Sequence, residues 1–255
     1  MIWKAIGNSV TGTSHIATGK PCEDAVKYRV IEAEDGSQVL ICCASDGAGS
    51  AEFGGLASEY VTKTVIEQLA LKIVQAEVVT EATVFELAES LFDGLEKQAA
   101  EKSVDLQEFS CTLLGCCISA ERAVFFQVGD GAIVRNDGSG FYTPVWWPQN
   151  GEYLNSTSFI IDDRSFSQLK MLVLEETVDE IALFTDGLQM LALNMEGCNV
   201  HQPFFTGLFR YLRMGDDPEK IAVLDRKLAE YLDSTMINER TDDDKTLFLA
   251  TRQEG

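Results

Sequence analysis

Acidic residues recur at the ends of short apolar runs along this chain. Asp46 lies just after the apolar run 39–43 and is followed directly by Gly47. Four further acidic segments also border strand-like apolar runs, namely Glu23-Asp24, Gly129-Asp130, Thr185-Asp186 and Asp242-Asp243-Asp244. One Asp-Gly pair after a strand indicates only a turn. Five acidic corners on five strand-like segments instead predict a common site.

Carboxylates that converge need a partner that offsets their repulsion. Two of them about 5 Å apart repel by about 3 kcal/mol at an effective dielectric constant of about 20. Bound divalent cations offset this cost, or some of the acids must be protonated. Oxygen ligands favour hard cations such as Mg²⁺ and Mn²⁺. Zinc is not expected, because the only histidines are His15 and His201 and the chain has no Cys-x-x-Cys segment.

The order and spacing of these corners resemble one family, the metal-dependent PP2C-type protein serine/threonine phosphatases. The resemblance runs from residue 12 to residue 249. It is carried by Glu23-Asp24, Asp46-Gly47, Cys111-Thr112-Leu113, Val128-Gly129-Asp130, Thr185-Asp186-Gly187 and Asp243-Asp244-Lys245-Thr246. Other segments resemble a compact bacterial branch in which the phosphatase is a stand-alone domain, namely 12–15, 21–25, 151–155 and 238–244. Each motif is short, but the ordered set is specific.

The resemblance implies two core metal ions, Mn²⁺ or Mg²⁺. Asp46 would bridge both ions, and the carbonyl of Gly47 would join the first. The shell of the second ion would be completed by Glu23, Asp186 and Asp243. The resemblance thus assigns most of the acidic corners to one binuclear centre.

Two further acids have implied roles. Asp130, together with Asp186, matches a third and weaker metal site. Asp24 would orient the attacking water. The nucleophile is then a metal-activated water that hydrolyses phosphoserine or phosphothreonine, and no phospho-enzyme forms.

The chain departs from the family pattern at two positions. Many relatives carry an arginine that grips the phosphate five residues before the position of Asp24, and here that residue is Gly19. Many eukaryotic relatives carry a histidine, proposed as a general acid, where this chain has Ala48. Lys20 or His15 could supply the lost function, although His15 fits a turn-capping role nearly as well.

Two readings other than catalysis are open. A phosphatase-like sensor would bind phosphoprotein or metal without turnover, and the missing arginine is its best support. Retention of every metal-site acid argues against it, because that cluster is costly without metal. An acidic Ca²⁺-binding module is the other reading, but the chain has no EF-hand loop spacing.

Composition limits the partners. The 255 residues carry 41 acidic and 20 basic side chains, a net charge of −21, which argues against nucleic acid and anionic membranes as partners. Seven cysteines, several of them inside apolar runs, are typical of buried thiols in a reducing compartment. No signal peptide or membrane span is expected. We therefore expect a cytoplasmic protein.

Apolar periodicity predicts the elements that position these acids. Strands are expected near 2–6, 25–31, 39–46, 111–119, 123–128, 132–135, 181–184 and 246–250, and helices near 53–75, 82–101, 188–194, 203–213 and 218–233. Residues 12–20 read as a polar loop. Helix pairs between runs of antiparallel strands indicate an α+β fold. The resemblance implies a four-layer α-β-β-α sandwich, with two stacked antiparallel sheets flanked by helix pairs.

We expect residues 1–255 to form a single phosphatase domain. The segment 141–176 is the least regular, and in phosphatases of this type the matching region is a mobile flap beside the active site. Its tryptophans, Trp146 and Trp147, fit packing under a loop better than substrate contact. The implied partners are a phosphoprotein substrate, a serine/threonine kinase whose action it reverses, and a von Willebrand A-type protein.

Overall fold

The computed structural model describes residues 2–33, 35–136, 138–148 and 157–253. The chain divides into two compact units. Unit 1 comprises Met1–Cys22, Gly131–Trp147 and Val178–Gly255, and unit 2 comprises Glu23–Asp130 and Pro148–Thr177. The motif at 151–155 lies outside the described residues.

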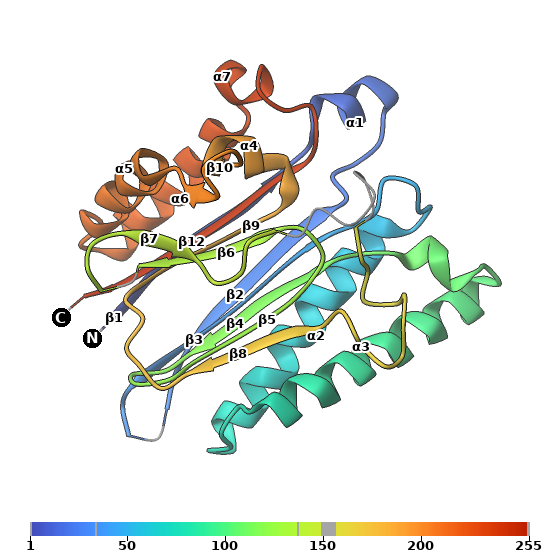
Figure 1. Ribbon diagram of the computed structural model, residues 1–255, viewed down its shortest axis with the longest axis horizontal. Helices are drawn as coiled ribbons and strands as arrows, with labels where there is room; N and C mark the ends of the chain where they lie inside the picture. Colours follow the sequence, from blue (N-terminus) through green and yellow to red (C-terminus); the bar gives the residue numbers. More distant parts are fainter. Residues whose placement is uncertain (1, 34, 137, 149–156, 254–255) are drawn as a thin grey trace. The chain divides into compact units, whose positions relative to one another are not determined.

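Unit 2 is a five-stranded antiparallel sheet with two long helices on one face (Figure 1). Its strands, in the order β2-β3-β4-β5-β8, are β2 (Asp24–Glu32), β3 (Gln38–Asp46), β4 (Leu113–Ile118), β5 (Ala123–Val128) and β8 (Lys170–Leu174). The helices are α2 (Gly54–Val74), α3 (Glu81–Lys102) and the short 3₁₀ turn η1 (Leu106–Phe109). Val61, Val65 and Leu69 lie on one face of α2 and are buried in the core of this unit. This is the burial that apolar residues at helical spacing predict.

Unit 1 is a second five-stranded antiparallel sheet. Its strands, in the order β1-β12-β9-β6-β7, are β1 (Ile2–Val10), β12 (Lys245–Gln253), β9 (Glu180–Phe184), β6 (Ala132–Asn136) and β7 (Tyr142–Pro144). Its helices are α1 (Thr13–Thr18), η2 (Asp186–Leu188), α4 (Gln189–Ala192), α5 (Gln202–Arg213), α6 (Pro218–Leu232) and α7 (Thr235–Asn238). A small hairpin joins β10 (Leu193–Asn194) to β11 (Asn199–Val200). Phe205, Phe209 and Leu228, from α5 and α6, are buried in the core of this unit.

The predicted α+β fold, with two antiparallel sheets and accompanying helices, is confirmed. Most long elements lie within a few residues of their predicted ranges. The predicted polar loop 12–20 is wrong in part, because Thr13–Thr18 forms the short helix α1. The strand after Asp130 does not extend the β4–β5 sheet, since β6 pairs with β9 in the sheet of unit 1. The last strand lies inside its sheet, between β1 and β9.

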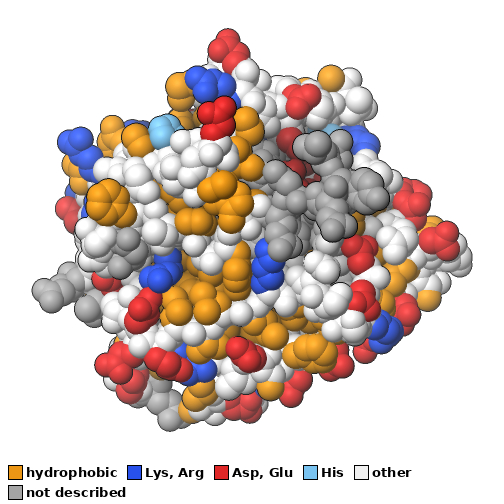
Figure 2. All heavy atoms as spheres, in the orientation of Figure 1, with side chains coloured by type: hydrophobic (Ala, Val, Ile, Leu, Met, Phe, Trp, Pro, Cys, Tyr) orange, Lys and Arg blue, Asp and Glu red, His pale blue; other side chains and the backbone are white. Residues whose placement is uncertain are grey.

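Short elements in irregular sequence were not predicted. The segment 141–176 contains β7 and β8, and Trp147 packs against the core of unit 1, as the packing interpretation expects. Whether the segment acts as a flap stays a prediction. Within the described part of the chain, no helix combines the length and apolarity needed to cross a bilayer. Figure 2 shows acidic side chains spread over the face it draws, with fewer basic ones among them.

Candidate active site

In unit 2, four of the predicted site residues meet at one end of the β2–β3 pair. Asp24 lies directly opposite Asp46 across the two strands. The Gly47 N–H donates to the carbonyl oxygen of Glu23 at 3.1 Å. Glu23 and Asp24 are buried and Asp46 is half-buried. Like charges directly opposite on adjacent strands are destabilising, so this pairing favours a cation between them.

Thr112 fixes the backbone of Asp46. The N–H of Asp46 donates to the Thr112 hydroxyl at 2.9 Å, and the Thr112 N–H donates to the Asp46 carbonyl at 2.8 Å. The hydroxyl of Ser45 also donates to the Thr112 carbonyl at 2.5 Å. The Cys111-Thr112-Leu113 motif thus has a structural role at this corner, which the sequence alone does not reveal.

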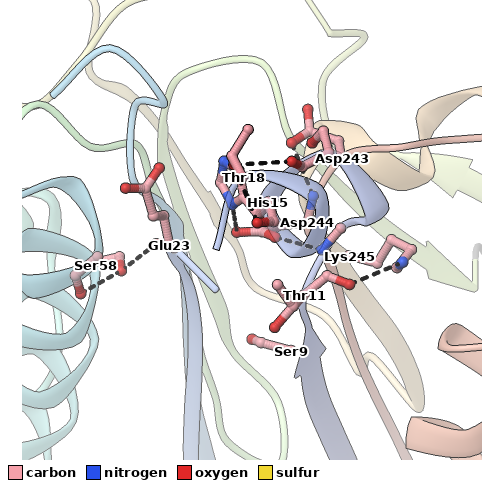
Figure 3. Close-up of polar contacts among 12 residues, drawn as sticks. Ser9, Thr11, His15, Thr18, Glu23, Ser58, Asp243, Asp244 and Lys245 are labelled. Carbon is pink, nitrogen blue, oxygen red and sulfur yellow. Dashed lines mark hydrogen bonds and ion pairs between the residues drawn. The ribbon is translucent and has the colours of Figure 1, made fainter. Parts of the chain in front are cut away.

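The turn after Asp46 has no room for a side chain. A Cβ atom added at Gly47 would lie 2.3 Å from the backbone carbon of Gly54, the first residue of α2. The Glu23 carbonyl also accepts from the hydroxyl of Ser58 on α2, at 2.6 Å (Figure 3). Glycine at this position therefore lets the acidic corner pack directly against the beginning of the helix.

Asp130 follows β5 in the same unit. Its carboxylate accepts from the hydroxyl of Thr157 at 2.5 Å. Thr157 belongs to the segment for which a flap is predicted. The described residues therefore link the acid of the predicted third metal site to that segment.

Unit 1 builds its acidic corner in the same way as unit 2. The N–H of Thr246 donates to the Thr185 hydroxyl at 3.1 Å, and the Thr185 N–H donates to the Thr246 carbonyl at 3.3 Å. Thr185 directly precedes Asp186. A Cβ atom at the next residue, Gly187, would lie 2.0 Å from the carbonyl oxygen of Asp244. Asp186 is thereby held beside the loop that begins β12.

That loop carries Asp243 and Asp244. Although Asp243 is exposed to solvent, partial desolvation of its carboxylate raises its pKa, and the neighbouring charge of Asp244 acts in the same direction. Asp244 is buried and accepts two hydrogen bonds, from the N–H of Gly12 at 2.6 Å and from His15 Nδ1 at 3.0 Å (Figure 3). The acidic run indicated a role for Asp243, but nothing in the spacing singled out Asp244.

Lys245 is a fully buried cation next to this pair. Its Nζ donates to Asn238 Oδ1 at 2.7 Å and to the Thr11 carbonyl at 3.4 Å. Burial lowers the pKa of Lys245, while the carboxylates of Asp233 and Asp244 oppose that change. Lys245 therefore holds the backbone just before α1 through its contact with the Thr11 carbonyl.

The segment predicted to bind phosphate, residues 12–20, contains α1 and turns at Gly19. α1 closes at Gly19, whose φ of 72° is left-handed, and the Lys20 N–H donates to the His15 carbonyl at 2.9 Å. Lys20 is exposed. Among the described residues, no heavy atom lies within 4 Å of a Cβ atom added at Gly19, and its left-handed backbone conformation disfavours a side chain there.

The donors present fit a hard divalent cation, because every predicted ligand is a carboxylate or carbonyl oxygen and Gly47 exposes its backbone at a crowded corner. Among the described residues, no group of three or more His, Cys, Asp or Glu side chains is placed to hold a metal ion. Glu23, Asp24, Asp46, Gly47 and Asp130 belong to unit 2. His15, Lys20, Asp186 and Asp243 belong to unit 1. Each unit by itself thus supplies part of the predicted set.

Comparisons with known proteins agree on one family. The family model of protein phosphatase 2C matches residues 11–233. Serine/threonine-protein phosphatase 3 of Escherichia coli (strain K12) is 34% identical over 251 residues, which cover 98% of this chain and 98% of that protein.

Two solved structures illustrate the shared fold. The serine/threonine phosphatase Stp1 from Staphylococcus aureus has a TM-score of 0.62 at 15% identity, covering 100% of this chain and 96% of that chain. The structure of RsbX in complex with magnesium has a TM-score of 0.57 at 15% identity, covering 98% of this chain and 94% of that chain. Because the family model spans most of the sequence and a relative is 34% identical across nearly all of it, this chain belongs to the protein phosphatase 2C family.

Proposed function

We propose that this protein hydrolyses phosphoserine and phosphothreonine in proteins, with two core Mn²⁺ or Mg²⁺ ions and a third, weaker one. The observation that carries the proposal is the corner in unit 2, where Asp24 and Asp46 face each other beside the sterically restricted backbone of Gly47. Opposed carboxylates in this arrangement favour a bound cation, and the family to which the chain belongs is metal-dependent. The assigned ligands are Glu23, Asp46, Gly47, Asp130, Asp186 and Asp243.

A divalent cation in such a centre lowers the pKa of bound water and neutralises phosphoryl oxygens. The residues of the chain itself position the metal ligands and the attacking water. Asp46 is held on its backbone by Thr112, which keeps its carboxylate at one place on the sheet end. Asp24, buried on the adjacent strand, accepts a hydrogen bond from the attacking water and so orients it.

The α1 segment supplies the phosphate contacts that the metals do not. Lys20 offers a positive charge on a long, exposed side chain just after α1, and His15 offers an imidazole. Lysine cannot fork two parallel hydrogen bonds to a phosphate as arginine does. We therefore expect weaker substrate binding than in relatives that carry an arginine at the position of Gly19.

The substrate, the partners and the place in the cell are further parts of this proposal. The substrate is a phosphoprotein, and the reaction reverses that of a serine/threonine kinase in the cytoplasm. A von Willebrand A-type protein is a further proposed partner, on the resemblance to the compact bacterial branch. Neither the fold nor the comparisons support a non-catalytic sensor.

Phosphatase assays with p-nitrophenyl phosphate and a phosphothreonine peptide test the function. We expect turnover of both after addition of Mn²⁺ or Mg²⁺, and none in protein stripped with EDTA. Asp46→Asn serves as the matched inactive control. Full activity of the metal-free protein, or a trapped phosphoryl group on His or Asp, would refute a metal-activated water.

A further inference from the structure

Asp244 joins the loop that carries the proposed metal ligand Asp243 to the segment that carries the proposed phosphate contacts. Its Oδ1 accepts the Gly12 N–H at 2.6 Å, and its Oδ2 lies 3.0 Å from His15 Nδ1. Asp244 is only 3% exposed, whereas 13% of the His15 side chain is accessible. A buried carboxylate with two partners on one short segment is suited to positioning rather than to direct contact with a substrate.

The same two segments are joined at other points. The N–H and the hydroxyl of Ser14 both donate to the Asp242 carbonyl, at 2.9 Å and 2.7 Å. A Cβ atom at Gly12 would lie 2.3 Å from the carbonyl carbon of Asp243. The backbone contacts place α1, and the contact of Asp244 Oδ2 with His15 Nδ1 adds a restraint on the His15 ring.

We infer that Asp244 is the positioning residue of His15 and that it holds the neutral imidazole as the tautomer protonated on Nδ1. A carboxylate has no proton to donate, so the 3.0 Å contact requires the hydrogen on Nδ1. Nε2 then carries the lone pair, so the neutral ring can only accept a hydrogen bond there, and Lys20 is left as the phosphate donor of the α1 segment. That His15 serves the phosphatase reaction rests on the proposed function, but the tautomer does not.

The first test is nitrogen NMR of protein labelled in histidine, at a pH where both rings are neutral. The chain has only His15 and His201. His201 Nδ1 lies 3.1 Å from the Leu191 carbonyl oxygen, so it provides an internal reference for an Nδ1-protonated ring that Asp244 does not touch.

We expect His15 to show the Nδ1-protonated form in the unaltered protein and the Nε2-protonated form in Asp244→Asn. The asparagine oxygen can accept from Gly12 while its NH₂ donates to His15 Nδ1, which moves the ring proton. The spectrum of His201 should not change. An Nε2-protonated His15 in the unaltered protein, or a His15 tautomer that is the same in both proteins, would overturn the inference.

The second test is a double-mutant cycle on phosphopeptide turnover. Asp244→Asn and His15→Ala should each lower kcat by about 10- to 100-fold, the loss typical of supporting partners in such sites. The double variant should be no slower than His15→Ala, because both changes remove one positioned ring. If the two kcat losses multiply in the double variant, Asp244 acts through a group other than His15.

Mn²⁺ calorimetry separates positioning from metal binding. Asp244→Asn should keep the Mn²⁺ affinity that Asp243→Asn loses. The control variant Asp242→Asn, at the exposed neighbouring residue, should match the unaltered protein in Mn²⁺ affinity and in phosphopeptide turnover. Equal loss of Mn²⁺ affinity in Asp244→Asn and Asp243→Asn would refute positioning. If no variant and no parent protein turns over substrate, the proposed function fails while the NMR result still decides the tautomer.

Discussion

Asp46 is the residue on which the proposed chemistry depends most, because one carboxylate is assigned to both core metals. Asp46→Asn keeps the backbone bonds to Thr112 but removes the negative charge proposed to bridge two cations. We expect kcat to fall by at least about 100-fold, with the fold intact by circular dichroism. Calorimetry with Mn²⁺ should show loss of the tight sites.

Asp130→Asn is the matched comparison. Asp130 bonds to Thr157 and is assigned to the weaker third ion, so the variant should keep tight Mn²⁺ binding while losing activity. If both variants lose tight binding to the same degree, the division of roles between Asp46 and Asp130 is wrong.

Gly19 is constrained by its backbone rather than by its neighbours. Any other L-residue in a left-handed conformation costs about 1–2 kcal/mol, and asparagine costs least. Gly19→Arg should therefore lower the Michaelis constant for a phosphopeptide while reducing the free energy of unfolding by about that amount. Gly19→Asn is the control, since it tolerates the conformation without adding charge.

Lys20→Ala is the reciprocal test of the same segment. Loss of the exposed ammonium group should raise the Michaelis constant and leave kcat nearly unchanged. A phosphopeptide Michaelis constant that stays the same in both Lys20→Ala and Gly19→Arg would place the phosphate grip outside the α1 segment.

At the scale of elements, a buried carboxylate ties three strands and a helix of unit 1 together. Glu180 on β9 accepts two bonds from Arg213 of α5, both at 2.6 Å, together with bonds from Tyr142 on β7 at 2.7 Å and Thr251 on β12 at 3.1 Å. Burial, followed by the Glu180 carboxylate, raises the pKa of Tyr142, so its hydroxyl stays a donor.

Arg213→Ala should destabilise the protein by leaving that carboxylate without its bidentate partner. Removing one partner of a fully buried pair costs about 3–5 kcal/mol. Because 40% of the Arg213 side chain is exposed, we expect about 2 kcal/mol, measured by urea unfolding. Arg210→Ala, an exposed change in the same turn of α5, should have almost no effect.

The elements also show what sequence can and cannot provide. Long periodic segments such as α2 and α3 were predicted closely, because one apolar face fixes both their type and their extent. The transfer of the chain to a second sheet after Asp130 was missed, since pairing of β6 with β9 depends on residues far apart in sequence. Sheet membership is a property of tertiary contacts and leaves no local periodicity.

The candidate site could likewise be predicted only in part from the sequence. The acids of β2 and β3 were predicted from their place at strand ends, and cross-strand pairing brings Asp24 opposite Asp46. Thr112 and Asp244 were missed as supporting residues, because a hydroxyl or an extra acid in a motif shows no partner until the chain folds. The metal and catalytic roles of the individual residues stay predictions.

At the scale of the whole molecule, the cysteines report on packing. All seven are thiols, and five of them are buried, namely Cys42, Cys43, Cys111, Cys116 and Cys117. Burial raises the pKa of Cys111 and of Cys117 to about 12, which suppresses the reactive thiolate. The expectation that cysteines inside apolar runs serve as small core residues is confirmed for Cys42, Cys43, Cys116 and Cys117.

Native protein should therefore react with Ellman's reagent quickly at the exposed Cys198 and more slowly at the half-buried Cys22. The five buried thiols should react only on unfolding in guanidinium, so that seven are counted in total. Cys198→Ser should remove the fast phase alone. A fast phase of more than one thiol in that variant would show that the core opens readily.

The pairing of β1 with β12 has a consequence for how the protein is made. Ile2 lies opposite Gln253 and Val10 opposite Lys245, so β1 is synthesised long before the strand with which it pairs. Until then β1 is an unpaired edge that can pair with other chains. The Gly12 and His15 contacts of Asp244 form only in that final step. Nascent chains that stall before β12 should therefore carry neither an ordered α1 segment nor phosphatase activity, and chaperones that shield β1 should raise the yield of active enzyme.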